Sequence, residues 1–411
     1  QQLKVLCYDF EARQVLAVKA SPLALDLREG GVAEQHAGAW LEALRGAVGQ
    51  VDPAVRRSVV AIGVAGQQHG FVPLDRADQV LAPVKLWCDT STREDCAAIV
   101  AELGGPAACL EAAGNVVLPG YTASKVRAFR RHRRELYDRL GTILLPHDYI
   151  NLHLTGERCM EAGDASGTGF LDVRRRVWSD AVLCAIVADE LGLPAGIPVS
   201  IGGGDNMMAA IATGNTAAGT LTMNLGTSET VFAHAAAPVI DPGGNISAFC
   251  SSTGGWLPLL CTMNCTVSTE LARGLFGFSL QEFAAAVSAA PRGSGGVLTL
   301  PFFAGERTPN LPAGKGCIVG LDQGNTRREN LLRSAVEGAT FALRFGIYEL
   351  ARLGIVGSTI VLTGGGSRSA TWRQIVADVC GLPVRVPEYE EGAAFGAALQ
   401  ALALIDPAAR G

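Results

Sequence analysis

The strongest fold signal in this chain is Val199-Ser200-Ile201-Gly202-Gly203-Gly204-Asp205-Asn206. The apolar residues 197–201 predict a buried strand, and residues 207–212 after the glycines predict a helix. A strand that ends in glycines and reopens as a helix brings backbone close to a ligand in α/β proteins. Asp205 stands at the predicted helix start, where it either caps the helix or points into a cleft.

The composition describes a globular protein with a large core. At 411 residues the chain is long enough for two domains, or for three. Apolar residues make up 48% and charged residues 18%, so extensive disorder is not expected. The net charge is −5 and no long basic block occurs, which argues against nucleic acid or an anionic membrane as partner.

Other features predict a cytoplasmic protein. No apolar run reaches the roughly 18 residues of a membrane-spanning helix, and no signal peptide opens the chain. The 11 cysteines are odd in number and scattered, so we expect reduced, buried thiols. Cys261 and Cys265 have a CxxxC spacing without a second pair or a nearby histidine, which disfavours a metal site.

The first half alternates strand and helix patterns. We expect strands at 3–10, 15–20, 57–64, 80–87 and 143–148, helices at 36–48 and 149–154, and a loop at 164–168. Polar side chains follow several predicted strand ends, and these are Gln68, His69, Trp87, Asp89 and Asp164. Amide, imidazole and carboxylate groups in fixed positions suit a hydroxyl-rich ligand, although a single histidine in a turn often has only a structural role.

The second half follows a similar plan. We expect strands at 220–225, 229–235, 359–363 and 384–386, and helices at 372–380 and 392–404. The order of elements resembles that of the first half, and residues 359–366 correspond to residues 59–66. This predicts two related α/β domains, 1–213 and 214–411, that flank a central cleft.

Two glycine-rich loops in the second half are candidates for phosphate binding. The chain contains neither GxxxxGK[ST] nor GxGxxG, so a P-loop or an ordinary dinucleotide fold is not expected. Leu225-Gly226-Thr227-Ser228 and Gly364-Gly365-Gly366-Ser367 each follow a predicted strand. Glycines let backbone N–H groups approach phosphate oxygens, and a helix after Ser369 adds favourable partial charge. Plain turn chemistry is the alternative for each loop taken alone.

Several short motifs together resemble one family. They are Gly66-Gln67-Gln68-His69-Gly70, Pro119-Gly120-Tyr121-Thr122-Ala123-Ser124-Lys125, Gly202-Gly203-Gly204-Asp205-Asn206, Leu225-Gly226-Thr227-Ser228, Gly305-Glu306-Arg307-Thr308-Pro309 and the segment 316–337. In this order they resemble the FGGY carbohydrate kinases, and within that family the kinases of the ketose D-xylulose. The resemblance covers almost the whole chain, although Ala128 stands where the family pattern has tryptophan.

The resemblance implies a fold and a set of roles. The fold would be α/β, with two duplicated ribonuclease-H-like (actin-like ATPase) domains that bind a small-molecule sugar in the first half and ATP in the second. Asp205 matches the family's catalytic base. The matching sugar-site residues are Gln68, His69, Trp87, Asp89, Asp205 and Asn206, and the matching nucleotide-site residues are Gly226, Thr227, Gly365, Gly366 and Ser369.

The chain departs from the family pattern in places. The first residue of the Gln68-His69 pair is methionine in related bacterial kinases, which bears on sugar specificity. In the family an aspartate and a Gly-Thr turn that bind Mg2+ and phosphate precede the position of Gln1, so no metal ligand is assigned in this chain. The segment 191–196 is short, and a C-terminal tail beyond Gly411 has no counterpart.

The implied reaction is transfer of phosphoryl from ATP with Mg2+ to the primary hydroxyl of D-xylulose. Asp205 would accept the hydroxyl proton, and the helix N-terminus would keep its carboxylate ionised at pH 7. Two alternatives stay open: an FGGY kinase for another ketose or a polyol, and a non-enzymatic actin-like ATP switch. Asn206 favours xylulose over glycerol, since glycerol kinases usually carry glutamine there. A homodimer is compatible with each of these.

Overall fold

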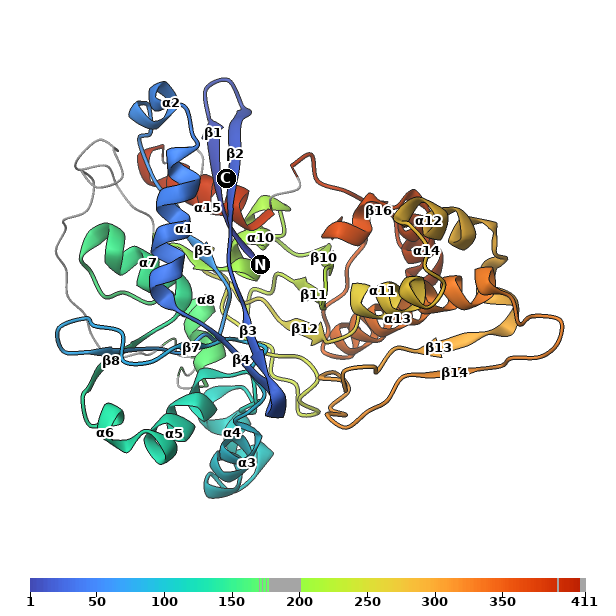
Figure 1. Ribbon diagram of the computed structural model, residues 1–411, viewed down its shortest axis with the longest axis horizontal. Helices are drawn as coiled ribbons and strands as arrows, with labels where there is room; N and C mark the ends of the chain where they lie inside the picture. The colour runs from blue at the N-terminus through green and yellow to red at the C-terminus, as the bar shows by residue number, and fades with distance from the viewer. Residues whose placement is uncertain (170, 172, 175, 177–200, 390–391, 407–411) are drawn as a thin grey trace. The chain divides into compact units, whose positions relative to one another are not determined.

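The structure is a computed structural model that describes the chain except residues 170, 172, 175, 177–200, 390–391 and 407–411 (Figure 1). The chain forms two compact units. Unit 1 comprises Gln1–Ala212, Ala248–Trp256 and Glu391–Gly411, and unit 2 comprises Thr213–Ser247 and Leu257–Glu390. The α/β class and the two-part organisation are as predicted. The sequence predicted a single domain boundary between residues 213 and 214. In the structure two later segments, Ala248–Trp256 and Glu391–Gly411, also belong to unit 1.

Unit 1 combines short strands with ten helices in its described part. Its strands are β1 (Gln2–Asp9), β2 (Gln14–Pro22), β3 (Asp26–Arg28), β4 (Val32–Gln35), β5 (Ala65–Gly66), β6 (Val72–Asp75), β7 (Val84–Lys85), β8 (Leu140–Leu144) and β9 (Gly203–Gly204). Its α-helices are α1 (Ala37–Gly49), α2 (Pro53–Arg57), α3 (Arg93–Glu102), α4 (Pro106–Ala113), α5 (Thr122–His132), α6 (Arg134–Tyr137), α7 (Pro146–Thr155), α8 (Ala162–Ala165), α10 (Asp205–Ala212) and α15 (Gly392–Ile405). Two short 3-10 helices are η1 (Glu29–Gly31) and η2 (Ser166–Thr168).

The first helix shows why unit 1 has a core. Strands β1 and β2, predicted as strands at 3–10 and 15–20, form an antiparallel hairpin, and α1 lies along it (Figure 1). The spacing of Ala37 and Trp40 along α1 turns both side chains to one face, where they pack with Val72 and Leu74 of β6. Burial of such a stripe is the main source of helix stability in a folded protein.

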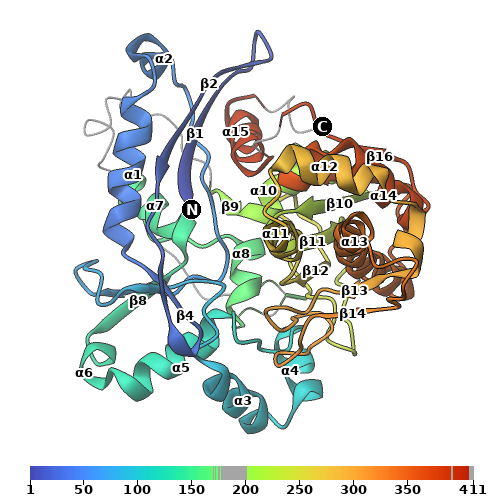
Figure 2. The same ribbon diagram turned by 45° about the vertical axis from the view of Figure 1, so that its right-hand side comes forward.

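Two strands of unit 1 carry the candidate site. Strand β5 pairs in parallel with β9, with Ala65 opposite Gly203 and Gly66 opposite Gly204. Helix α10 follows β9 directly, and α15 from the C-terminal part of the chain packs beside α10 (Figures 1 and 2). The carboxyl ends of two adjacent parallel strands are where ligands bind in α/β sheets.

Two strand predictions in unit 1 were wrong. Residues 57–64 form no regular strand, because Arg57 ends α2 and β5 begins only at Ala65. An added Cβ on Gly63 would lie 1.9 Å from the carbonyl oxygen of Ala397, so α15 closely covers this segment. The predicted strand 80–87 is reduced to β7, because only Val84 and Lys85 pair with β4. Tertiary contacts override the local preference for strand in both places.

Two other predictions near the site were wrong in detail. The strand predicted at 143–148 ends at Leu144, because Pro146 opens α7. The loop predicted at 164–168 is helical, as α8 followed by η2, and Glu161 caps it by accepting the N–H of Asp164 at 2.7 Å. Most of the strand predicted at 197–201 lies outside the described residues.

Unit 2 is a more regular α/β layer structure. Its strands are β10 (Thr220–Leu225), β11 (Glu229–Ala233), β12 (Leu259–Thr262), β13 (Leu298–Leu300), β14 (Cys317–Val319), β15 (Thr359–Thr363) and β16 (Val384–Arg385). Its helices are α11 (Thr266–Leu275), α12 (Leu280–Ala289), α13 (Arg328–Arg352) and α14 (Ala370–Cys380), with 3-10 helices η3 (Arg292–Gly296) and η4 (Gly365–Arg368). The main sheet has the order β12-β11-β10-β15-β16, and β15 is parallel to both β10 and β16.

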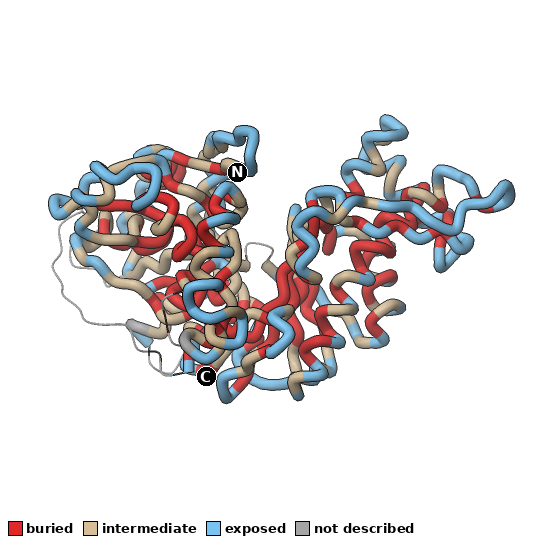
Figure 3. The backbone as a smooth tube through the Cα atoms, turned by 90° about the horizontal axis from the view of Figure 1, so that it is seen from below, coloured by how far each residue is buried: buried red, intermediate tan, exposed pale blue. Residues whose placement is uncertain are grey.

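The core of unit 2 lies between this sheet and its helices. Leu221, Met223 and Leu225 alternate along β10, so all three point to the same face, and they pack with buried side chains of α13 and α14. Figure 3 colours the chain by burial, and its buried segments lie inside while the exposed turns lie outside. The strands predicted at 220–225 and 359–363 have the observed bounds of β10 and β15. Among the described residues no helix is long and apolar enough to cross a membrane.

Candidate active site

The loops after β5 and β9 bring three predicted sugar-site residues together. The side-chain amide of Asn206 donates to Gln68 Oε1 and to Asp205 Oδ1, each at 3.1 Å. Gln68 Nε2 in turn contacts Met207 Sδ at 3.4 Å. Gln68 is buried, whereas Asp205 remains exposed. The carboxylate of Asp205 therefore sits at the accessible end of a hydrogen-bonded chain that is anchored inside unit 1.

The three glycines before Asp205 each have a close neighbour. Gly202 has φ of 73°, and an added Cβ there would lie 2.5 Å from the carbonyl oxygen of Val64. The corresponding atom on Gly203 would lie 2.8 Å from Met208 Cε, and on Gly204 it would lie 2.8 Å from Gln68 Cγ. A side chain at Gly202 would press on the backbone just before β5, and one at Gly204 would press on Gln68 just after it. The glycines thus allow the contact between Gln68 and the start of α10.

The surroundings of Asp205 make its carboxylate a stronger base than the sequence suggested. Desolvation by the surrounding protein raises the pKa of Asp205 from 3.8 to about 6, against the opposing effect of the backbone N–H of Asn206, which donates to Oδ1 at 2.8 Å. The side chain still meets solvent, which limits the size of this shift. The predicted effect of the helix N-terminus is therefore outweighed. The carboxylate remains mainly ionised at pH 7 and is better matched to accepting a proton.

His69 lies beside Gln68 but is buried in an aromatic site. Its backbone is left-handed, with φ of 64°, which is uncommon for a residue other than glycine. The imidazole lies between the rings of Tyr121 and Phe249, with centroid distances of 4.8 and 5.9 Å. The predicted contact of His69 with sugar stays a prediction.

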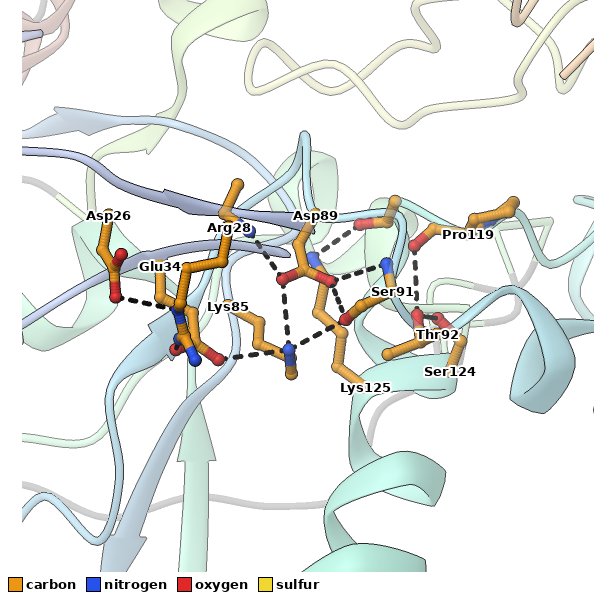
Figure 4. Close-up of polar contacts among 12 residues, drawn as sticks. Asp26, Arg28, Glu34, Lys85, Asp89, Ser91, Thr92, Pro119, Ser124 and Lys125 are labelled. Atoms are coloured by element: carbon orange, nitrogen blue, oxygen red, sulfur yellow. Dashed lines mark hydrogen bonds and ion pairs between the residues drawn. The ribbon is translucent and has the colours of Figure 1, made fainter. Parts of the chain in front are cut away.

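Asp89 is held by the protein itself (Figure 4). It is fully buried, and its two oxygens accept hydrogen bonds from the backbone N–H of Ala33, from both donors of Ser91 and from Lys85 Nζ. These bonds tie the strand β4 to the loop after β7. They favour a structural role for Asp89 in shaping the region around Trp87, which is half-buried. Direct contact of Asp89 or Trp87 with sugar stays a prediction.

A buried ionic cluster lies directly behind β5 and β9. His147 Nδ1 is 2.6 Å from Asp164 Oδ2, and His147 Nε2 is 2.9 Å from Asp148 Oδ1, with all three side chains fully buried. Burial alone would lower the pKa of His147, but the two carboxylates outweigh it and raise the pKa well above 6.5. Burial also raises the pKa of Asp164, which opposes this pairing. We assign the imidazolium form to His147, because a carboxylate faces each ring nitrogen.

The cluster supports the strands that carry the site. An added Cβ on Gly66 would lie 2.8 Å from the backbone nitrogen of His147, and one on Gly202 would lie 3.2 Å from His147 Cδ2. The imidazole therefore packs against the ends of β5 and of the segment before β9. Asp205, which directly follows β9, is exposed.

In unit 2 the two predicted phosphate loops are brought together. Because β10 and β15 are parallel neighbours, Gly226 and Gly364 leave the sheet at the same edge. An added Cβ on Gly364 would lie 2.6 Å from the carbonyl oxygen of Leu225, and one on Gly366 would lie 2.8 Å from Leu225 Cβ. The loops are thus in contact through backbone and leave little room for side chains. Such a cradle suits a phosphate chain.

The remaining nucleotide-site residues fall around this contact. Gly365 has no atom within 4 Å of an added Cβ, so that its outer face is open. Ser369 caps α14 by accepting the N–H of Trp372 at 3.2 Å. The turn that contains Thr227 is anchored to the start of α11, because the N–H groups of Cys265 and Thr266 donate to the carbonyls of Thr227 and Gly226.

Comparison with known proteins identifies the family of this chain. Residues 1–189 match the FGGY family of carbohydrate kinases, N-terminal domain, and residues 214–405 match its C-terminal domain. The chain is 40% identical to a xylulose kinase of Haemophilus influenzae over 98% of this chain and 88% of that protein. The chain belongs to the FGGY family of carbohydrate kinases.

Solved structures of similar proteins include other FGGY kinases. A kinase from Brucella ovis, named as a xyloylose kinase, aligns with a TM-score of 0.90 and 30% identity over 98% of this chain and 88% of its own. A xylulose kinase from Bifidobacterium adolescentis aligns with a TM-score of 0.80 and 27% identity over 95% and 88%. These matches extend the family assignment across both units of this FGGY chain.

Two buried acidic sites of this FGGY chain were missed from the sequence, one of them in part. In the His147 cluster Asp164 was a candidate for the polar site, but its partners His147 and Asp148 fall inside a segment predicted as strand. The other is Glu229, a fully buried carboxyl that directly follows the turn 226–228 and accepts the hydroxyl of Thr262 at 2.8 Å. An acidic residue at the start of an otherwise apolar strand was the signal available for Glu229.

The nucleotide and the metal fit the described residues differently. The glycine cradle formed by Gly364 and Gly366 fits a phosphate chain, as its backbone leaves no space for side chains. No group of three or more His, Cys, Asp or Glu side chains in the described part of this FGGY chain is placed to hold a metal ion. Magnesium that accompanies a nucleotide needs only one or two carboxylates besides phosphate oxygens and water, and we assign none here.

Proposed function

We propose that this FGGY chain transfers a phosphoryl group from ATP to the primary hydroxyl of D-xylulose and forms D-xylulose 5-phosphate. The single observation that carries the proposal is the bonded set of Gln68, Asp205 and Asn206 at the ends of two parallel strands. This set places an accessible carboxylate beside amide groups that suit sugar hydroxyls. The 40% identity to a protein named xylulose kinase supports the choice of sugar.

In the proposed reaction Asp205 moves one proton. The hydroxyl oxygen of the sugar forms a bond to the γ-phosphorus of ATP while the bond from that phosphorus to the leaving oxygen of ADP breaks. The hydroxyl proton passes to the Asp205 carboxylate. A pKa raised to about 6 makes this carboxylate ready to accept the proton while still leaving it mostly free at pH 7.

The remaining acceleration comes from positioning and electrostatic stabilisation. Gly226, Thr227, Gly365 and Gly366 would hold the phosphates with backbone N–H groups, and Ser369 would lie toward the adenosine. Bound magnesium would neutralise phosphate charge when it accompanies ATP. Asn206 would orient both the sugar and the carboxylate of Asp205, since one amide group already bonds Asp205.

The test is coupled ADP release with ATP and magnesium, measured across D-xylulose, L-xylulose, D-ribulose, sedoheptulose, glycerol and xylitol. We expect the largest kcat/KM with D-xylulose and its loss in Asp205→Asn. A preference for another acceptor would keep the phosphoryl transfer and replace the sugar assignment. ADP release that no acceptor stimulates would overturn the kinase proposal in favour of an ATP switch.

A further inference from the structure

The backbone of His69 is held by a buried lysine. Lys125 is fully buried in α5, and its Nζ donates to the carbonyl oxygens of His69 and Gly120, each at 2.7 Å. Thr122 Oγ1, at the start of the same helix, also donates to the His69 carbonyl at 3.2 Å. Two side chains of one helix therefore converge on a single carbonyl oxygen in the candidate sugar-site loop.

That carbonyl belongs to a residue in an unfavourable conformation. A left-handed backbone persists in a residue other than glycine only when its surroundings fix it, and such residues gather at functional sites. The ring of His69 is fixed as well, because an added Cβ on Gly167 would lie 2.0 Å from His69 Nδ1. The rings of Tyr121 and Phe249 pack against the imidazole and further restrict its movement.

Lys125 is too deeply buried to contact a substrate itself. Its relative exposure is 0%, and its ammonium is used by backbone carbonyls. A buried ammonium is costly unless its hydrogen bonds are made, so its place in this chain requires a specific task. Gln68 immediately precedes His69, and its side chain accepts a hydrogen bond from Asn206 beside the carboxylate of Asp205. Lys125 is thus connected to the base through the backbone of the loop 66–70.

We propose that Lys125 is a positioning residue of the sugar site, which holds the left-handed backbone of His69 and thereby sets the placement of Gln68 and His69. This inference rests on the proposed function, because it assigns these two residues to the sugar. It also gives a physical reason for the motif 119–125, whose glycine carbonyl, threonine and lysine all take part in the same contact.

The test compares three single variants of α5. Lys125→Met keeps the length of the side chain and removes its donors, and Thr122→Val removes only the longer bond to His69. Ser124→Ala is the matched control, because Ser124 is equally buried in the same helix but bonds Thr92 and the carbonyl of Tyr121. We expect the KM for D-xylulose to rise about tenfold to a hundredfold in Lys125→Met and about two- to fivefold in Thr122→Val. The KM for ATP should stay within about twofold in all three.

A second readout tests the contact without relying on activity. The Cε1 proton of His69 should show a ring-current shift from Tyr121 and Phe249 in the NMR spectrum of the whole protein, identified by its absence in His69→Ala. We expect Lys125→Met to move this signal toward the position of an exposed histidine, while Ser124→Ala leaves it unchanged. In the His69→Ala background, Lys125→Met should raise the KM for D-xylulose by a smaller factor than in the unmodified protein, because only the placement of Gln68 then remains to be lost.

Each outcome decides the proposal. An unchanged sugar KM and His69 signal in folded Lys125→Met would overturn it, as would equal increases in the KM for sugar and for ATP. If Lys125→Met does not fold, the graded effect of Thr122→Val against Ser124→Ala decides instead. If the unmodified protein phosphorylates no acceptor, the proposed function fails, while the NMR signal still shows whether Lys125 positions His69.

Discussion

Strands β5 and β9 in unit 1, and strands β10 and β15 in unit 2, are both parallel neighbours that end in candidate site loops. In unit 1 the loops present side chains, which are held from behind by buried charged groups such as His147 and Lys125. In unit 2 the loops present backbone, and glycines bring them into contact. The same arrangement of strands is thus completed with two different kinds of chemistry.

The difference follows from what each loop would recognise. A sugar is distinguished by the direction of its hydroxyls, which requires amides and carboxylates in fixed rotamers. A phosphate chain carries charge on every oxygen, so that backbone N–H groups at a strand end suffice. Unit 1 should therefore be sensitive to loss of buried charge, and unit 2 to any added side chain at its glycines.

The largest expected effect is on the charge behind unit 1. His147→Ala leaves the carboxylates of Asp148 and Asp164 buried without their shared partner, and removal of one member of a buried ion pair typically costs about 3–5 kcal/mol. We expect this loss in the free energy of unfolding measured with urea. His153→Ala, a half-buried histidine of the same helix, is the control and should cost less than about 1 kcal/mol. Equal effects of the two would show that the ionic cluster does not stabilise unit 1.

The next effect is on turnover. Asp205→Asn removes the proton acceptor, and a positioned base typically contributes about 10²- to 10⁴-fold, so kcat should fall at least about a hundredfold. The fold should persist, because the raised pKa means that ionisation of Asp205 opposes folding as the pH rises through its folded value. Asparagine has no such charge, so the thermal midpoint at pH 7 should be equal or higher. Near normal kcat in this variant would exclude Asp205 as the base.

The same assignment predicts how activity depends on pH. Only the ionised carboxylate of Asp205 accepts a proton, so kcat/KM for the sugar should fall as the pH drops through the pKa raised to about 6. Solvent contact at Asp205 places the midpoint between the ordinary value of 3.8 and that figure. A profile measured from pH 4 to 8 with the D-xylulose concentration well below KM tests this. A rate that stays constant down to pH 4 would contradict a raised pKa.

A smaller effect is expected from the backbone of unit 2. Gly364 has φ of 82°, and a methyl group there would meet Leu225, so Gly364→Ala strains the loop by about 1–3 kcal/mol. We expect the KM for ATP to rise about tenfold, with the KM for sugar unchanged. Gly381 has φ of 67° and open space around it, so Gly381→Ala separates backbone strain from the clash. If both variants raise the KM for ATP equally, the contact between the two loops is not what binds phosphate.

The sequence predicted unit 2 better than unit 1 for a physical reason. Strands β10 and β15 have several paired residues and a local apolar pattern, and their bounds were predicted to the residue. Strands β5 and β9 have two paired residues each, and their position depends on α15, which is more than 300 residues distant from β5 in the chain. Motif resemblance predicted Gln68, Asp205 and Asn206 as site residues, and the structure brings their side chains together. The partners of His147 and Lys125 become visible only when the chain is folded.

The smallest expected effect concerns Glu229, a buried carboxyl that directly follows the turn 226–228. Burial raises its pKa well above 4.5, so the neutral acid is the form that folding favours. A folded pKa above the unfolded one contributes stability at low pH, and this stability is lost as the pH rises through the folded value. Unlike His147, Glu229 should therefore be needed for its shape and its hydrogen bond rather than for charge.

Glu229→Gln tests this distinction, because the amide has the shape of the neutral acid and can still accept the hydroxyl of Thr262. At pH 5 the variant should be within about 0.5 kcal/mol of the unmodified protein, and its relative stability should increase toward pH 9. Glu229→Ala, which leaves the Thr262 hydroxyl without this partner, should cost about 1–3 kcal/mol at pH 5. This cost should shrink toward pH 9 in parallel with Glu229→Gln, because both variants lack the titrating carboxyl. Urea unfolding at pH 5, 7 and 9 measures all three proteins. A large loss of unfolding free energy in Glu229→Gln at pH 5 would mean that unit 2, like unit 1, depends on buried charge. The two strand pairs would then differ only in their exposed loops.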